Sequence, residues 1–144
     1  MALVELLLPA VPAHVRTARL VVVAAARRAG LDDDFVADLR LALGEACSRA
    51  VGLHLRHAPL RQVVVVVQDD ATGLTVTVRD VGPAPSSLQG DAAGLFEDDG
   101  DDSVGSPDVA LAVVAGLVDN LKVTPSAAGT SVVMRWPLPV RFPG

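Results

Sequence analysis

The sequence predicts a mixed α/β two-layer sandwich in which three helices pack on one face of a single sheet. The 144 residues are most simply one domain covering residues 1–144. The hydrophobic fraction of 51% comes mainly from Val, Ala and Leu, and aromatic residues make up only 3%. That composition suits a sheet covered by helices. β-branched runs also alternate with segments whose apolar residues recur every three or four positions, which predicts strands and amphipathic helices in turn.

The chain begins with a predicted strand and helix. Residues 4–8 form an apolar run that ends at Pro9, which is typical of a short strand. Pro12 is well placed near the start of a helix, and a helical segment then runs to Arg28. Gly30 follows directly and is expected to end that helix.

A second helix follows, with Asp32, Asp33 and Asp34 supplying an N-terminal cap and charges that favour the helix dipole. Apolar residues then recur at three- and four-residue spacing, which predicts one buried stripe. The stripe consists of Phe35, Leu39, Ala42, Leu43, Ala46, Cys47, Ala50 and Val51.

The second half predicts two hairpins separated by a loop and a third helix. Residues 63–67 and 75–79 are β-branched runs on either side of a turn. Residues 82–107 are rich in Gly, Pro, Ser and Asp, and a loop of that length is usually a functional lid or disordered. Pro107 opens a helix through Val118, after which residues 121–123 and 131–136 form the second hairpin.

Charge is distributed unevenly along the chain. The net charge is -5, but residues 1–61 hold eight Arg against six acids, while residues 62–144 hold four basic residues against eleven acids. Six acids lie in the predicted lid, namely Asp91, Glu97, Asp98, Asp99, Asp101 and Asp102. This acidic loop, and the lack of a basic patch with interleaved aromatics, argue against direct binding of nucleic acid.

The sequence also predicts a cytoplasmic protein. No apolar run approaches the ~20 residues of a membrane span, and the first residues do not read as a secretion signal. Cys47 is the one cysteine, which fits a reducing compartment. The three histidines show no metal-ligand spacing with Cys47, so no metal site is expected from these residue types.

Two short segments stand out as candidates for a site. Glu45 and Arg49 lie four residues apart on the second helix, off its apolar stripe. They could face a ligand, or they could simply pair with each other, an interaction worth about 0.3–0.5 kcal/mol. Asp80 and Gly82 follow a strand, and Thr130 lies at the start of another. These could equally be ordinary turn residues.

The chain resembles the GHKL (Bergerat-fold) ATPases. Their first two nucleotide-binding motifs correspond, in the same order along the chain, to Glu45 to Ala50 and to Asp80 to Ala84. The branch that the chain resembles is that of the small anti-sigma factors and serine kinases. The resemblance implies a Bergerat-type mixed sheet and ATP or ADP as ligand. It implies that Glu45 polarises the attacking hydroxyl or water, and that Asp80 accepts a hydrogen bond from the adenine amino group. Gly82 and Ala84 would complete the adenine motif, and Thr130 would join its network through water.

The chain departs from the family pattern where phosphates and metal are held. The family has Asn at the position of Arg49, where it holds magnesium, and Arg has five donors and no acceptor. Arg49 would either contact phosphates directly or mark the loss of triphosphate binding, and magnesium is not expected. The glycine motif that opens the last family helix falls on Asp108 to Leu111, with Gly105 as a partial substitute.

The resemblance implies transcription regulation by partner switching. The chain would control a sigma factor in exchange with an anti-anti-sigma (STAS-type) protein, with kinase activity weak or lost. One alternative is an active ATP-dependent serine/threonine kinase acting on the anti-anti-sigma factor. The other is a nucleotide-free interaction scaffold. Family members often dimerise through the first strand and helix, and the apolar residues 6–8 would permit a homodimer.

Overall fold

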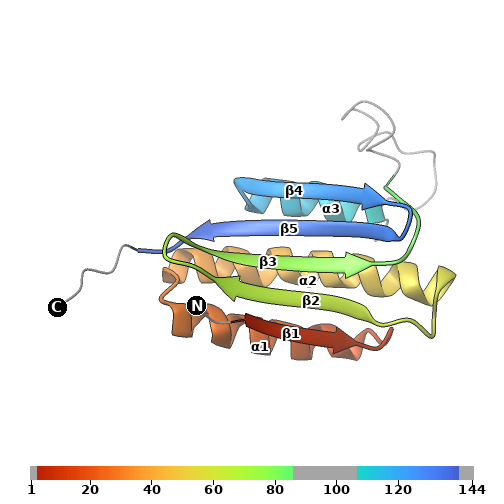
Figure 1. Ribbon diagram of the computed structural model, residues 1–144, viewed down its shortest axis with the longest axis horizontal. Helices are drawn as coiled ribbons and strands as arrows, with labels where there is room; N and C mark the ends of the chain where they lie inside the picture. The colour runs from red at the N-terminus through yellow and green to blue at the C-terminus, as the bar shows by residue number, and fades with distance from the viewer. Residues whose placement is uncertain (1–2, 86–106, 140–144) are drawn as a thin grey trace.

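Five strands and three helices form two layers in the computed structural model, which describes residues 3–85 and 107–139 (Figure 1). Among these residues the three helices lie together behind the sheet, and no helix covers its other face. The predicted α+β sandwich is therefore confirmed. The elements in chain order are β1 (Leu3–Leu8), α1 (Ala13–Ala29), α2 (Asp33–His57), β2 (Val63–Asp69), β3 (Gly73–Asp80), α3 (Pro107–Leu117), β4 (Asn120–Ser126) and β5 (Gly129–Pro137).

The sheet has the order β1-β2-β3-β5-β4, and all four pairings are antiparallel. The expectation of a mixed sheet is wrong in this respect. Strands β3 and β4 are each antiparallel to β5, so these two strands run in the same direction. They are not neighbours, because the β4–β5 hairpin places β5 between them and antiparallel to both.

The ends of the first two helices follow the predicted signals. Gly30 ends α1 in a left-handed conformation with φ of 93°, and its N–H bonds to carbonyls of the last helical turn. The side chain of Asp32 caps α2 by accepting a hydrogen bond of 2.9 Å from the N–H of Asp34. Both caps satisfy backbone groups that the helix itself leaves unpaired.

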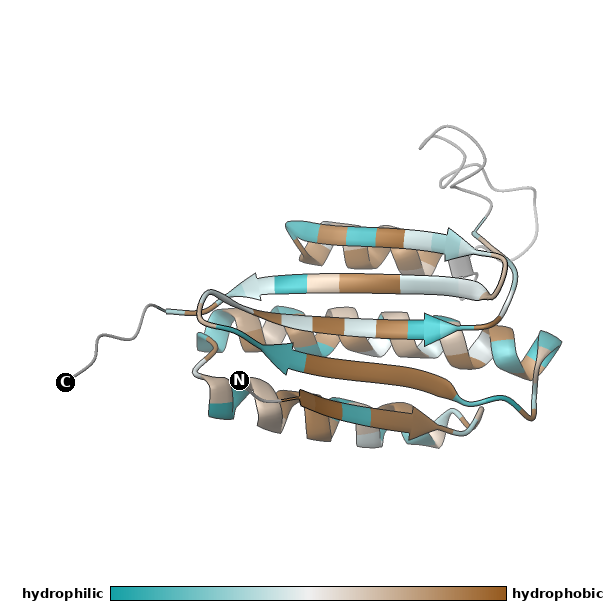
Figure 2. Cartoon of the chain, viewed as in Figure 1, coloured by the Kyte–Doolittle hydropathy of each residue, from teal (hydrophilic) through white to brown (hydrophobic). Residues whose placement is uncertain are grey.

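The core lies between the helices and the inner face of the sheet. Alternate residues of β2 and β3 point into it, and the hydropathy colouring shows β2 as a nearly continuous apolar strand (Figure 2). The predicted stripe of α2 is buried apart from Phe35, which is half-buried. Cys47 is fully buried within it, and burial raises the pKa of its thiol to about 12. The thiol is therefore neutral at physiological pH.

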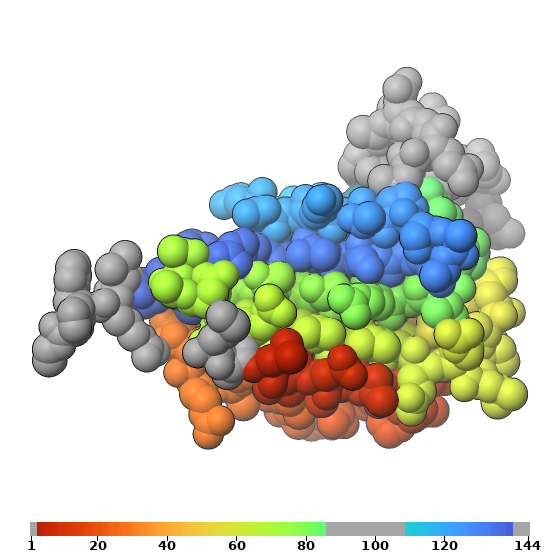
Figure 3. All heavy atoms as spheres, in the orientation of Figure 1, coloured from red at the N-terminus to blue at the C-terminus, as the bar shows by residue number. Residues whose placement is uncertain are grey.

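The outer face of the sheet is seen in the space-filling view, where the strands lie side by side (Figure 3). β1 forms one edge, and its outward side chains Leu3 and Leu7 are 66% and 52% exposed. They pair in register with Gln68 and Val64 of β2. This edge strand thus carries exposed apolar side chains next to unpaired backbone groups.

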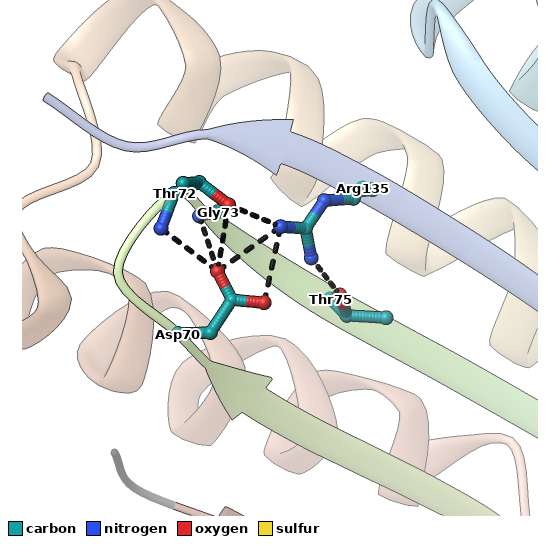
Figure 4. A network of polar contacts seen from close by, with 5 residues as sticks. All are labelled: Asp70, Thr72, Gly73, Thr75 and Arg135. Carbon is teal, nitrogen blue, oxygen red and sulfur yellow. Dashed lines mark hydrogen bonds and ion pairs between the residues drawn. The ribbon is translucent and has the colours of Figure 1, made fainter.

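A polar network fixes the β2–β3 turn to β5 (Figure 4). Asp70 accepts hydrogen bonds from the backbone N–H groups of Thr72 and Gly73, and its carboxylate pairs with Arg135 at 3.0 Å. Arg135 also donates to the hydroxyls of Thr72 and Thr75. These donors hold the pKa of Asp70 well below its usual range, the Arg135 guanidinium having the largest effect. The network lies at the opposite end of β3 from Asp80, so it supports the hairpin and not the candidate site.

In the ranges described, no helix combines the length and the apolar character that crossing a bilayer would require.

Candidate functional site

The candidate site is built around a buried ion pair between α2 and the end of β3. Nη1 of Arg49 donates to Oδ2 of Asp80 at 2.7 Å, and the two side chains are 1% and 0% exposed. Arg49 therefore belongs to the buried face of α2. The pairing of Arg49 with Glu45 that the sequence offered as an alternative is wrong, because Arg49 forms its ion pair with Asp80. Arg49 thus pairs with a strand residue 31 positions later in the chain, and not with Glu45 on its own helix.

The other oxygen of Asp80 shapes the turn that follows β3. Oδ1 accepts the backbone N–H of Gly82 at 2.9 Å, a bond that closes a turn of the Asx type. A Cβ at position 82 would lie 3.0 Å from Cβ of Leu53 on α2, so the absence of a side chain lets this turn approach the helix closely. Asp80 and Gly82 thus have structural roles that need no ligand.

The start of β5 closes the other side of the site. Thr130 is the register partner of Asp80 across the β3–β5 ladder, so the two side chains share the helix-facing side of the sheet. Thr130 is 2% exposed, and its hydroxyl has no hydrogen-bond partner. Gly129 has φ of 142°, and a Cβ there would overlap the carbonyl oxygen of Asp80. Only glycine fits between these backbones.

His54 links the same turn to the end of α2. Its ring is fully buried, Nε2 accepts the backbone N–H of Val81 at 3.0 Å, and Nδ1 lies 2.9 Å from the carbonyl oxygen of Arg61. Because the N–H of Val81 can only donate, Nε2 must be the unprotonated nitrogen and Nδ1 must donate to Arg61. This link between α2 and the residue next to Asp80 is a tertiary contact that no local sequence pattern indicates.

The remaining predicted residues lie apart from this pair or outside the described ranges. Glu45 is half-buried on α2, one turn before Arg49, and Ala84 is exposed after the turn. Gly105 lies outside the described residues, as does most of the predicted lid. The structure therefore brings together Arg49, Asp80, Gly82 and Thr130, and it adds His54 and Gly129 to them.

These residues do not fit a magnesium ion. A magnesium site needs oxygen ligands, whereas position 49 presents a cation that has no acceptor atom. The nearest carboxylate, Asp80, has one oxygen bonded to Arg49 and the other to Gly82. Within the described ranges, no group of three or more His, Cys, Asp or Glu side chains could hold a metal.

Residues 8–136 match the family model of the histidine kinase-like ATPase domain. The chain belongs to this family. The match covers α2 with Arg49, the end of β3 with Asp80 and the start of β5 with Thr130. This histidine kinase-like ATPase domain contains the buried ion pair between Arg49 and Asp80, two residues that the sequence resemblance singled out.

A solved structure shares the fold of this histidine kinase-like ATPase domain. The crystal structure of the RsbU and RsbW domains of Rv1364c from Mycobacterium tuberculosis is similar, with a TM-score of 0.69 and 20% sequence identity. The similarity covers 100% of this chain and 35% of that one, so the chain spans about a third of its length. At this identity the similarity shows a common GHKL-type fold. No curated protein matches the sequence.

A second feature is a basic groove on the helical layer. It has a volume of about 490 Å³ and lies between α1 and α2. Its lining residues are Arg16, Arg19, Leu20, Val23, Ala24, Arg27 and Arg40. The side chain of Arg19 lies beside Gly44, where a Cβ would be in ordinary van der Waals contact with it at 3.6–3.7 Å. Leu20 is 68% exposed at the rim. The groove combines an apolar surface with four positive charges.

Proposed function

We propose that this domain is a partner-binding regulator of the anti-sigma type, which acts without magnesium-dependent phosphoryl transfer. It would bind a sigma factor and exchange it for an anti-anti-sigma protein in the cytoplasm. Family membership and the motifs at Asp80 and Thr130 support the anti-sigma assignment. The buried Arg49–Asp80 pair carries the second part of the proposal. The resemblance implies a metal ligand at position 49 and an adenine contact at Asp80, and the observed bond between these two side chains supports a site that does neither.

The pair makes phosphoryl transfer unfavourable through the residue at position 49, and not through Glu45. Glu45 is not bonded to Arg49, so its capacity as a base is not what is lost. What is lost is the metal ion, which in phosphoryl transfer bridges phosphate oxygens and neutralises developing charge. A guanidinium already bonded to Asp80 does not take over that role.

We therefore expect no phosphorylation of an anti-anti-sigma partner. The measurement is transfer of labelled phosphate from ATP, with magnesium, to purified candidate partners. The wild-type chain should give no more product than a Glu45→Ala variant, because both lack a metal site. Robust transfer by the wild type that disappears in Glu45→Ala would show that the enzyme is a working kinase.

The basic groove supports a protein partner with acidic side chains. Electrostatic complementarity raises association rates in a salt-dependent way. The four Arg residues of the groove are Arg16, Arg19, Arg27 and Arg40. Arg19 is partly buried, and its Nε atom is enclosed without a hydrogen-bond partner. A charge reversal at Arg19 would therefore disturb packing, whereas Arg16 and Arg27 are exposed.

Reversing Arg16 and Arg27 to Glu should slow association with the partner by about tenfold or more at low salt, and by less at high salt. Stopped-flow or surface-binding kinetics would measure this. Arg56→Glu is a matched control, because Arg56 is exposed at the far end of α2 and does not line the groove. An association rate that the double reversal leaves unchanged at low salt would contradict the role of the groove.

A homodimer remains part of the proposal. β1 is an edge strand with exposed Leu3 and Leu7, which is compatible with pairing between two copies. Sedimentation velocity over a range of concentrations would detect it, and a purely monomeric chain at all concentrations would exclude it.

A further inference from the structure

Two buried side chains of the site keep unused hydrogen-bonding groups. Nε and Nη2 of Arg49 and Oγ1 of Thr130 are enclosed and have no partner among the described residues. The two residues are 4% and 2% exposed. Buried polar groups are nearly always hydrogen-bonded, so such atoms call for a bound group or water. Both residues adjoin Asp80, Arg49 through the ion pair and Thr130 as its cross-strand partner, so the unpartnered atoms indicate a site for something other than protein.

The arrangement of the donors defines what would fit. Arg49 uses only Nη1 for Asp80, which fixes the guanidinium. Its two unused nitrogens, Nε and Nη2, lie on one edge of the planar group and direct their N–H bonds in parallel, the geometry that binds two oxygens of one acceptor. The hydroxyl of Thr130 is the cross-strand neighbour of Asp80 and supplies a third polar group on the same side of the sheet.

From this geometry we propose that Arg49 and Thr130 form a metal-independent site for a carboxylate. A carboxylate is planar and offers two oxygens to the guanidinium edge. It also carries a single negative charge, and the adjacent Asp80 carboxylate, already on the same guanidinium, disfavours a doubly charged phosphate. The inference rests on the proposed function, because it gives the former nucleotide site a different ligand. The carboxylate comes from a small molecule or from a Glu side chain of a peptide.

The test is an NMR titration of the full chain, which follows the Arg49 side-chain Nε–H and the Thr130 backbone amide. The probes are acetate, a short blocked peptide with a single Glu, inorganic phosphate, and sodium chloride at matched ionic strength. We expect saturable shifts with acetate or with the Glu peptide, and none with chloride. A response to one carboxylate probe and not the other identifies the source.

Variants separate this reading from a general effect on the protein. Thr130→Val should weaken carboxylate binding by about tenfold through loss of the hydroxyl. Arg49→Lys should abolish it, since lysine keeps the charge but not the paired donors. Thr77→Val removes a hydroxyl from the opposite face of β3 and should bind like the wild type. If Arg49→Lys does not fold, the comparison of carboxylate binding by Thr130→Val and by Thr77→Val tests the site instead.

Saturation by phosphate without any response to the carboxylate probes would overturn the proposed ligand class. The absence of any saturable shift would overturn the site and leave water as its occupant. Neither result would affect the measurements of partner association and phosphate transfer. Conversely, a carboxylate response together with robust kinase activity would contradict the proposed function and leave this site standing.

Discussion

Asp80→Asn should lower the free energy of unfolding by about 3–5 kcal/mol, the usual cost of leaving one member of a buried ion pair without its partner. The two side chains are 1% and 0% exposed, so solvent cannot compensate for the lost charge. Asparagine retains the oxygen that accepts from Gly82, which restricts the change to the ion pair. Chemical denaturation with an unchanged m-value would measure the loss.

A double variant, Arg49→Met with Asp80→Asn, is the matched control. It removes the buried cation together with the anion, and replacing both members of such a pair is often close to neutral. The double variant should therefore recover much of the stability that Asp80→Asn loses. If Asp80→Asn alone costs less than about 1 kcal/mol, the pair is not the buried interaction described above.

Gly129→Ala should be the second severe change, with a loss of about 3 kcal/mol or more. Two costs add: an L-residue is strained at φ of 142° by about 1–3 kcal/mol, and the new methyl group would overlap the carbonyl of Asp80, where overpacking costs about 1–3 kcal/mol. Because Gly129 precedes Thr130, the backbone shift that relieves the overlap should also disturb the site. Thermal or denaturant unfolding measures the loss of stability.

Gly116→Ala provides the comparison within the same chain. Gly116 lies on α3, and a Cβ there would meet nothing within 4 Å. Alanine should stabilise this helix by roughly 0.5–1 kcal/mol, since glycine is the poorer helix former. Equal effects of the two substitutions would show that the close contact between Gly129 and Asp80 is not present in the folded protein.

The local features of the fold could be predicted from the sequence because they depend on near neighbours. The period of apolar residues placed Leu39, Leu43 and Cys47 in the core, and Gly30 and Asp32 marked helix ends. The relative directions of neighbouring strands could not be predicted from the sequence in the same way. They depend on where the β4–β5 hairpin inserts relative to β3, which is a choice among long-range pairings.

The sequence singled out residues that the structure brings together, but it did not indicate how they are bonded. The motifs located Arg49, Asp80, Gly82 and Thr130, yet nothing local indicates that a helix residue pairs with a strand end 31 positions later. The sequence treated Arg49 and Glu45 as neighbours on one helix face. In the fold Arg49 is buried, and a buried guanidinium requires a partner of opposite charge. The carboxylate of Asp80 at the end of β3 is that partner.

The structure also gives some motif residues a role without nucleotide. Gly82 approaches Leu53, and Gly129 approaches the backbone of Asp80, so both glycines are required by packing alone. Because packing alone requires these glycines, their presence is not evidence that the chain binds adenine. The Arg49–Asp80 pair is the more informative feature, since the proposed loss of magnesium-dependent chemistry rests on it.

Calorimetric titration with ATP, with and without magnesium, tests whether the Arg49–Asp80 pair excludes a metal-bound nucleotide. Because Arg49 offers no metal ligand and engages Asp80, we predict that magnesium adds little to any binding and that ATP, ADP and adenosine are poorly distinguished. Arg49→Asn, which frees Asp80 and places an amide oxygen at position 49, should gain magnesium-dependent binding in the same titration. Tight binding of ATP to the wild-type chain that strictly requires magnesium would contradict the account.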